Sequence, residues 1–360
     1  MMLYKLLSRM NRDEFDSEVI SLTDSGPIAD KIKKLGIPVQ ALGMKRGIPS
    51  PIALVKLTLL LREIKPDLIQ TWLYHSDLVG GLAGKFSGGI KTFWSIRQSN
   101  IDTDSNKRST IWIAKVCSKL SPWLPDKIIC CSYAALESHV ALGYSKEKML
   151  VIPNGFDLDA FHPDPEARKS VRKEMGLDEK TYLVGIVARF DPQKDHQNFI
   201  HAAEFIRKSN SSVHFMLCGE GIGNENSQLK QWIKQAKLED RFHLLGIRND
   251  VSRLVAAMDV AVSSSLGEGF PNVVGEAMAC AVPCVVTDVG DSALIVGDAG
   301  RVVPAKDPEA LATAIIELLR TSPEFRQQLG KQARERVKYN YSLDSVVMKY
   351  EAVFRGVVND

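Results

Sequence analysis

The chain has 360 residues, which is enough for about two domains of ordinary size. With 45% hydrophobic and 25% charged residues it has the composition of a globular protein, which excludes a disordered chain, a collagen and a small disulfide scaffold. The net charge of +3 divides unevenly, because 21 Lys and Arg face 15 Asp and Glu up to Asp157, while the remainder is slightly acidic. The basic half predicts an anionic partner: a phospholipid surface, a phosphorylated acceptor or, least favoured without a recognition motif, nucleic acid.

Strands and helices alternate along the first half of the chain. The chain opens in a helix, with Leu3, Leu6, Leu7 and Met10 on one face. A doubly wound domain normally places a strand and a glycine-rich turn before its first helix, and that strand is central in the common order. We therefore expect a gap in the sheet, and we suspect that the true start lies upstream of Met1. The expected strands are 18–22, 38–42, 67–71, 91–96, 127–131 and 149–153, with helices at 28–34, 52–64, 78–86 and 109–120.

A turn at 154–157 separates this series from a second one, which begins with the near-continuous apolar run 182–187. Asp307-Pro308 is typical of a helix start. Two alternating series predict two Rossmann-like, doubly wound α/β domains. Their expected bounds are 1–157 and 158–341, with a last helix in 342–360 that packs back on the first domain. Further strands of the second series are expected at 213–218, 242–245, 260–264, 283–287 and 300–303.

The compartment is predicted from what the chain lacks. Its longest apolar stretch, 52–61, is interrupted by Lys56 and is too short to span a membrane. No signal peptide pattern is visible at the start. The six cysteines form no CxxC pair and no metal-ligand spacing, so we expect reduced, mostly buried thiols. These features predict a cytoplasmic protein.

The strongest candidate site is the segment 263–279, where a predicted strand ends in serines and a glycine-flanked loop leads into a helix. Ligands of open α/β sheets bind at the carboxyl ends of strands, and a helix start suits a phosphate. Glu268 and Glu276, eight residues apart around this turn, could accept hydrogen bonds from sugar hydroxyls. The alternative is that both are ordinary acids, one solvated and one stabilising the helix dipole.

A second candidate site follows the first strand of the second domain. Arg189 and Lys194 are placed to neutralise a diphosphate leaving group, which gains negative charge as its bond breaks. The alternative is that both side chains are solvated. The Gly219-Glu220-Gly221 segment is not a dinucleotide fingerprint, because Asn224 stands where a glycine is needed. We interpret it as a strand-to-loop turn that lets the nucleotide approach.

These motifs together resemble the retaining glycosyltransferases of family 4, which have the GT-B fold of two Rossmann-like domains facing a cleft. Glu268 and Glu276 match the E-x7-E element of that family, Arg189 and Lys194 match its basic pair, and Pro153-Asn154-Gly155 with Asp157 matches its interdomain turn. The resemblance covers nearly the whole chain except the missing start.

The resemblance implies a role for each matching residue. Glu276 is expected to bind the ribose and Glu268 the donor-sugar hydroxyls. The loop at Gly246-Ile247-Arg248 is expected to line the base, with Ile247 and Arg248 as its binding residues. Gly269, Phe270, Pro271 and Asn272 would offer backbone donors to the phosphate and the sugar. No metal and no cofactor is implied, because Arg189 and Lys194 take the place of a metal.

Two residues of the first domain are candidates for the acceptor side. A histidine common in the family is absent, and 93–97 stands in its place. His75 lies after the preceding strand and could face the same cleft, although a lone histidine is more often structural. Arg97 could hold an anionic acceptor or could be a solvated arginine. The family's glutamate shortly after Gly290 is also replaced, with Leu294 near that place.

Basic and aromatic residues interleave between Lys107 and Lys127, where Trp112 and Trp123 accompany five basic residues and only Asp126 opposes them among the acids. Such segments bind the interface of anionic lipid. This predicts a peripheral contact with the inner face of the membrane. The alternative is that Trp112, Ile113 and Val116 simply face the core.

We therefore expect a retaining glycosyltransferase that moves a sugar from a nucleotide diphosphate sugar to a saccharide or lipid-linked acceptor, in cell-surface polysaccharide or glycolipid synthesis. By resemblance, attack comes from the face that the leaving group vacates, and neither glutamate is assigned as a nucleophile. Two alternatives stay open: a nucleotide-sugar epimerase of the same fold, and a non-catalytic nucleotide-binding protein if Met1 is the true start.

Overall fold

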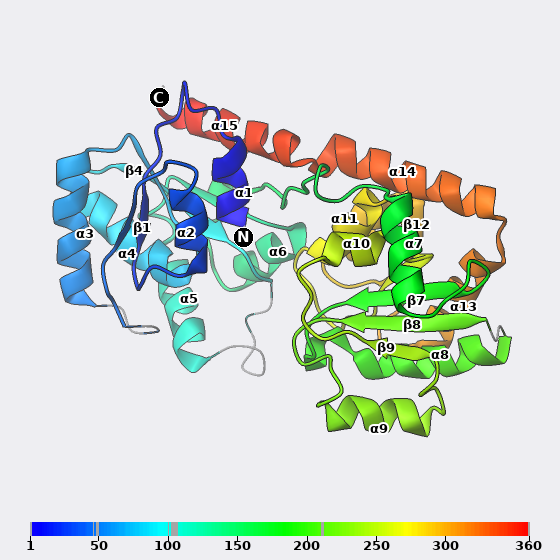
Figure 1. Cartoon of the computed structure of the whole chain (residues 1–360). Helices are drawn as coiled ribbons and strands as arrows, with labels where there is room; N and C mark the ends of the chain where they lie inside the picture. The colour runs from blue at the N-terminus through cyan, green and yellow to red at the C-terminus, as the bar shows by residue number, and fades with distance from the viewer. Residues whose placement is uncertain are drawn as a thin grey trace. The chain divides into compact units, whose positions relative to one another are not determined.

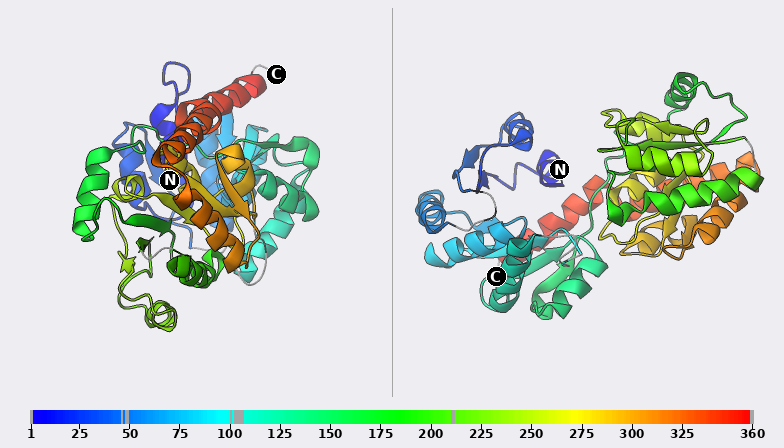
Figure 2. Two further views of the ribbon diagram at one scale, coloured as in Figure 1. Left: turned by 90° about the vertical axis from the view of Figure 1, so that its right-hand side faces the viewer. Right: turned by 90° about the horizontal axis from the view of Figure 1, so that it is seen from below.

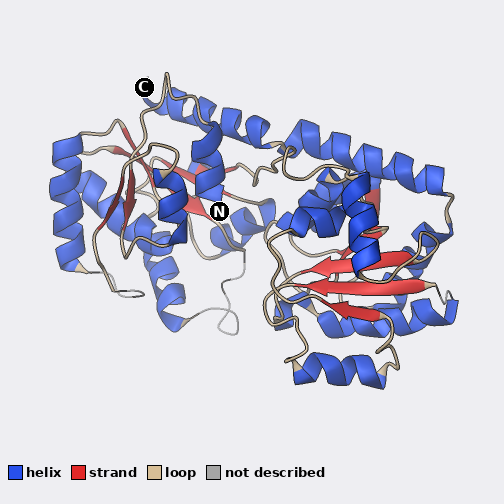
Figure 3. Ribbon diagram, viewed as in Figure 1, coloured by secondary structure: helices blue, strands red, loops and turns tan. Residues whose placement is uncertain are grey.

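The structure is a computed structural model that describes residues 2–45, 47, 50–99, 101, 107–209 and 212–358 (Figure 1). The chain folds into two compact units. Unit 1 contains the chain up to Gly155 together with the segment from Leu343, and unit 2 is Phe156–Ser342. The sequence placed these boundaries at 157 and 341, within two residues of the observed positions. Each unit combines parallel strands with flanking helices (Figure 3).

The strands described in unit 1 form two parallel sheets. One sheet has two strands, β1 (Val19–Ser21) and β2 (Val39–Ala41). The other has four strands in the order β3-β4-β5-β6. Their bounds are Leu68–Gln70, Lys91–Ile96, Lys127–Cys130 and Met149–Val151. The strands therefore match the expected positions to within a few residues.

Helices cover both sheets of unit 1. They are α1 (Met2–Arg9), α2 (Pro27–Lys33), α3 (Pro51–Ile64), α4 (Tyr74–Phe86), α5 (Arg108–Leu120), α6 (Tyr133–Ala141) and α15 (Leu343–Val358), with a 3₁₀ turn at Lys146–Lys148. On α1, Leu6 packs with α15 on the four-stranded sheet, whereas Leu7 packs with α2 beside the two-stranded sheet. The expectation that the last helix packs on the first domain is confirmed.

The two sheets of unit 1 share one hydrophobic cluster. Ile20 of β1 and Ile69 of β3 pack against the same cluster, which α3 and α4 provide. The residues of β1 and β3 are only half-buried, whereas β4 is almost wholly buried. The strands β1 and β3 belong to separate sheets. That the first domain lacks its first strand, and that a segment lies upstream, stays a prediction.

Unit 2 contains one continuous parallel sheet. Its six parallel strands follow the order β12-β11-β10-β7-β8-β9, so its first strand, β7, is central. In unit 1 the described strands are instead divided between a two-stranded and a four-stranded sheet. The strands of unit 2 are β7 (Tyr182–Val187), β8 (Val213–Cys218), β9 (Phe242–Leu244), β10 (Val260–Ser263), β11 (Cys284–Thr287) and β12 (Gly300–Val303).

Helices flank the sheet of unit 2, as Figure 2 shows from two further directions. They are α7 (Pro165–Glu174), α8 (His196–Ser209), α9 (Ser227–Gln235), α10 (Val251–Ala256), α11 (Asn272–Ala279), α12 (Ser292–Val296), α13 (Pro308–Arg320) and α14 (Pro323–Tyr341), with 3₁₀ turns at Pro192–Lys194 and Gly297–Ala299. Asp307 caps α13 as predicted, since its side chain accepts a hydrogen bond from the Ala310 N–H at 2.9 Å.

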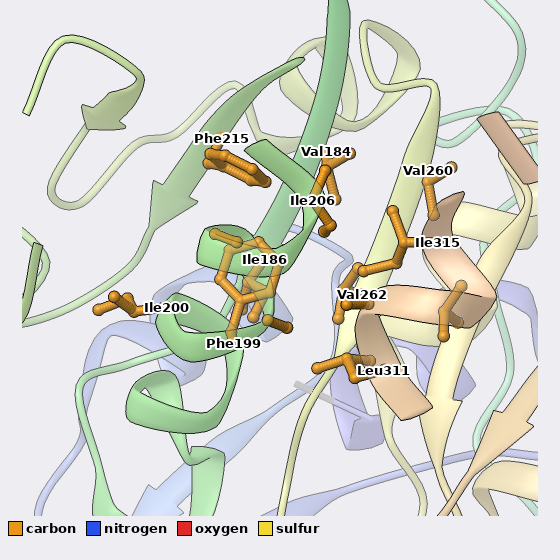
Figure 4. Close-up of a cluster of buried hydrophobic side chains, with 14 of the residues drawn as sticks. Val184, Ile186, Phe199, Ile200, Ile206, Phe215, Val260, Val262, Leu311 and Ile315 are labelled. Atoms are coloured by element: carbon orange, nitrogen blue, oxygen red, sulfur yellow. The ribbon is translucent and has the colours of Figure 1, made fainter. Parts of the chain in front are cut away.

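The core of unit 2 lies where α8 and α13 cover one face of the sheet (Figure 4). Val184 and Ile186 of β7 meet Phe199 of α8 and Ile315 of α13 there, all 3% exposed or less. This burial explains why β7 is apolar along its whole length, since a central parallel strand is covered on both faces. All six cysteines are buried and free, as predicted. No helix in the described part of the chain is long and apolar enough to cross a membrane.

Candidate functional site

Lys194 and Glu268 form the centre of the candidate site in unit 2. Lys194 ends the 3₁₀ turn that follows β7, and Glu268 lies in the loop between β10 and α11. The Lys194 Nζ lies 2.5 Å from Oε1 of Glu268, and the two side chains are 22% and 11% exposed. Because β7 and β10 are adjacent parallel strands, their carboxyl ends bring these two distant segments together. The two motifs found separately in the sequence are therefore one site.

Hydrogen bonds hold the two loops against each other. The Ser265 hydroxyl donates to Oε1 of Glu268 at 2.7 Å, so one carboxylate oxygen accepts from both a hydroxyl and an ammonium group. The Ser264 hydroxyl donates to the Lys194 carbonyl at 2.9 Å. The Leu266 N–H donates to the Gln193 carbonyl at 2.7 Å. Both serines belong to the motif found in the sequence, but these contacts depend on the pairing of β7 with β10 and are not encoded in the motif itself.

The loop after β11 also supports Glu268, through contacts that were not predicted from the sequence. The Thr287 hydroxyl donates to the Ser265 carbonyl at 2.6 Å, and the Asp291 N–H donates to the Gly269 carbonyl at 3.1 Å. Gly290 has a φ of +56°, and a Cβ there would collide with the Glu268 carbonyl. Only glycine satisfies both the conformation and the close approach. Gly290 was the only feature of the sequence that could have indicated this close approach of the two loops.

The helix start beside Glu268 is built as predicted. Pro271 is the N-cap of α11, Asn272 is its first residue and is exposed, and Glu276 lies half-buried in its second turn. The first N–H groups of a helix have no partner within the helix and, with the dipole, favour an anion. The Phe270 side chain is buried and stacks on Phe156 with 5.9 Å between ring centroids. Phe270 can therefore offer its backbone to a ligand while its ring anchors the loop.

Arg189 is not part of the Lys194–Glu268 pair in this structure. Its side chain is 61% exposed, and its Nε donates to Asp191 at 3.0 Å within the same loop. The segment after β8 is a strand-to-loop turn, as predicted, and its role in letting the nucleotide approach stays a prediction. Gly219 has a φ of +153°, and a Cβ there would collide with the Ala188 carbonyl, so the glycine lets the two loops pack.

The loop predicted to line the base lies at the carboxyl end of β9. Ile247 is exposed, as a residue that receives a ligand would be. The Arg248 guanidinium instead contacts Asp250 at 2.7 Å and Glu174 at 2.8 Å. These two partners raise the pKa of Arg248, and Arg248 holds the pKa of Asp250 well below its usual range. The side chain of Arg248 therefore ties this loop to α7.

The two candidates in unit 1 lie at the carboxyl ends of β3 and β4. His75 is in the first turn of α4, and its buried Nε2 has no hydrogen-bond partner among the residues that the structure describes. Leu73 precedes this helix with a φ of +75°, a strained conformation for a branched residue. Nearby, desolvation raises the pKa of the buried Asp77 to about 8, and the Thr71 hydroxyl donates to it at 2.5 Å.

Arg97 is a structural tie within unit 1. Its guanidinium lies 5.1 Å from the centre of the Trp72 ring, donates to the Tyr350 hydroxyl at 3.3 Å and contacts the Asn154 amide oxygen. It therefore joins β4 to α15 and to the turn that leaves unit 1. The expectation that it is a solvated arginine is wrong. Its role toward an anionic acceptor stays a prediction.

Two family models match successive parts of the chain. The family model "Glycosyltransferase Family 4" matches residues 1–160, and "Glycosyl transferases group 1" matches residues 167–336. The chain is 25% identical to the UDP-Gal:alpha-D-GlcNAc-diphosphoundecaprenol alpha-1,3-galactosyltransferase of Escherichia coli, over 96% of this chain and 90% of that protein.

Two further matches span nearly the whole chain. It is 24% identical to an N,N'-diacetylbacillosaminyl-diphospho-undecaprenol alpha-1,3-N-acetylgalactosaminyltransferase of Campylobacter jejuni, over 95% of this chain and 92% of that protein. Among solved structures, Anabaena HepE in complex with UDP has a TM-score of 0.85 at 21% identity, covering 99% of this chain and 95% of that one. The last match supports the GT-B fold.

Proposed function

Because the chain belongs to the group 1 and family 4 glycosyltransferases, we propose that it transfers a sugar from a UDP-sugar, with retention of configuration, to a saccharide carried on a polyprenyl diphosphate. The product would serve the synthesis of a cell-surface polysaccharide or glycolipid. The enzyme would need no metal and no cofactor, since Lys194 and Arg189 would neutralise the leaving diphosphate.

The Lys194–Glu268 pair carries this proposal. The Lys194 ammonium group lies beside the loop that leads into α11, so its charge adds to the positive end of the helix dipole. A UDP leaving group would gain negative charge there as its bond breaks. The Lys194 ammonium group donates to Oε1 of Glu268, and the Ser265 hydroxyl donates to the same oxygen. Once a donor binds, Glu268 can also accept hydrogen bonds from sugar hydroxyls. The Arg189 side chain is exposed, and its partner Asp191 is in the same loop. The Arg189 guanidinium can therefore turn toward the diphosphate.

The relatives support the choice of substrates. The E. coli protein uses UDP-Gal, and both full-length relatives act on saccharides linked to undecaprenyl diphosphate. The Anabaena protein binds UDP and UDP-glucose. We therefore assign uridine as the base and a lipid diphosphate saccharide as the acceptor. The basic charge of the first 157 residues suits such an acceptor.

Ligand-induced thermal shifts test the donor. UDP should raise the melting temperature more than GDP or ADP at equal concentration, because a ligand that binds the native state stabilises it. Incubation of a UDP-sugar with a polyprenyl-diphosphate saccharide should then give a product whose new linkage has the anomeric configuration of the donor by NMR, with or without EDTA. Inverted linkage, or loss of activity in EDTA that magnesium restores, would contradict the mechanism. Isomerised donor in the absence of acceptor would instead indicate an epimerase.

A further inference from the structure

Six large apolar side chains are exposed along one layer of helices in unit 1. The layer consists of α3, α4 and α5, which pack side by side. Two of the six are tryptophans, Trp112 at 61% exposed and Trp123 at 70% exposed. The interpretation that Trp112 faces the core is therefore wrong, whereas the same interpretation is confirmed for Ile113. The other four exposed side chains are Ile52, Val55, Leu59 and Phe86.

On α3 and on α5, the exposed side chains lie on the side of the helix opposite its buried residues. On α3, the buried Ala53, Leu57 and Leu61 face inward, while 52, 55 and 59 form an exposed stripe. On α5, Trp112 is followed at the same spacing by the exposed Lys115 and Lys119. We call this exposed side of the three helices, together with Trp123, the outer face of α3–α5.

Trp123 is held out from the protein by a fixed turn. Its N–H donates to the Leu120 carbonyl at 3.0 Å. The Lys148 ammonium group donates to the carbonyls of Pro122 and Pro125 at 2.6 and 2.7 Å, on both sides of this tryptophan. Large apolar side chains gathered on one surface mark a contact with a partner or a membrane.

The charge of the same surface indicates which partner. The three helices carry six basic residues, all exposed, against a single exposed acid, Glu63. Their other acid, Asp77, is buried. Tryptophan rings favour the boundary between lipid headgroups and acyl chains, and lysines can extend from their apolar stems to anionic headgroups. The six basic residues are Lys56, Arg62, Lys85, Arg108, Lys115 and Lys119.

We propose that the outer face of α3–α5 docks on a bilayer that contains anionic phospholipid. The contact is peripheral: Trp112, Trp123 and the α3 stripe enter the headgroup region, and the lysines bind lipid phosphates. This inference deepens the proposed function, because a polyprenyl-linked acceptor is itself held in a bilayer. It is tested without donor or acceptor, so its failure leaves the transferase assignment intact.

Vesicle flotation measures the docking directly. The full chain is mixed with vesicles of neutral phosphatidylcholine alone or with 30% phosphatidylglycerol added, about a third of the lipid, at low and at physiological salt. The test variants are K115E/K119E and W112A/W123A. The matched controls lie in unit 2: K230E/K234E reverses two exposed lysines of α9 with the same spacing, and F325A/Y339A removes two exposed aromatic rings of α14.

The wild-type chain should float with the anionic vesicles and less so as salt rises. Each lysine near the surface contributes roughly fivefold to binding, so K115E/K119E should bind about 25-fold more weakly or worse. W112A/W123A should also lose binding, and both controls should bind like the wild type. Equal losses in the controls, or unchanged binding in both test variants, would overturn the proposal. If the test variants instead turn a dimer into a monomer by sedimentation and no chain floats, the surface is a self-association face and the lipid proposal fails.

Discussion

Replacement of Lys194 by alanine tests whether the Lys194–Glu268 pair is both a structural contact and a catalytic one. The pair is 22% and 11% exposed, between a surface ion pair worth about 0–1 kcal/mol and a fully buried one whose disruption costs about 3–5 kcal/mol. We therefore expect a loss of about 2 kcal/mol at pH 7. For a unit of this size, that loss lowers the melting temperature of unit 2 by about 4–8 °C in calorimetry.

The same substitution should affect turnover more than binding. If Lys194 stabilises the charge that develops on the leaving diphosphate, kcat should fall about 100- to 1,000-fold, as for other groups aimed at a developing charge. The dissociation constant for UDP should rise less than kcat falls. The exposed Lys230 of α9 supplies the control, since K230A removes a lysine that is far from this loop in sequence and should leave both quantities unchanged.

A double-mutant cycle with Glu268→Gln shows whether the two side chains act as a pair. Glutamine keeps the shape of the side chain and an oxygen for the Ser265 hydroxyl but removes the charge. The double variant should lose less stability than the two single variants together, by about 1–2 kcal/mol. Effects on stability that add within about 0.5 kcal/mol would refute the pairing. A kcat loss matched by an equal loss of UDP affinity would refute the transition-state role.

Three further substitutions test other parts of the structure. Gly290→Ala should displace the Glu268 loop and weaken UDP binding by about tenfold or more in a titration. Gly176 has a similar positive φ but open space around it, so Gly176→Ala should leave UDP binding unchanged. Burial raises the pKa of Asp77 from 3.8 to about 8, so the wild type should lose stability relative to Asp77→Asn as the pH rises between these values. A difference in melting temperature between wild type and Asp77→Asn that is the same at pH 5 and at pH 8 would contradict this burial. Arg97→Lys should lower the melting temperature of unit 1, because lysine cannot stack on Trp72 and bind Asn154 and Tyr350 at once, and an unchanged value in calorimetry would contradict the structural role.

The helices and strands were predicted from local sequence patterns. The apolar run 182–187 and the Asp307-Pro308 start each depend on neighbours in the chain, and both were predicted correctly. The two candidate-site motifs were also visible, because glycines and acids around a helix start have a recognisable spacing. The placement of Trp112 could not be predicted, since one turn of α5 carries both the buried Ile113 and the exposed Trp112.

The sequence by itself determined the two α/β series, their boundary and the two loops that contain Lys194 and Glu268. Only the tertiary structure decided that these loops meet, because the pairing of β7 with β10 joins segments 74 residues apart. It also decided that Gly290 supports Glu268, and that Arg97 and Arg248 are held by partners distant in sequence. Periodicity and capping depend on adjacent residues, whereas the partners of a side chain depend on strand order, which no local pattern encodes.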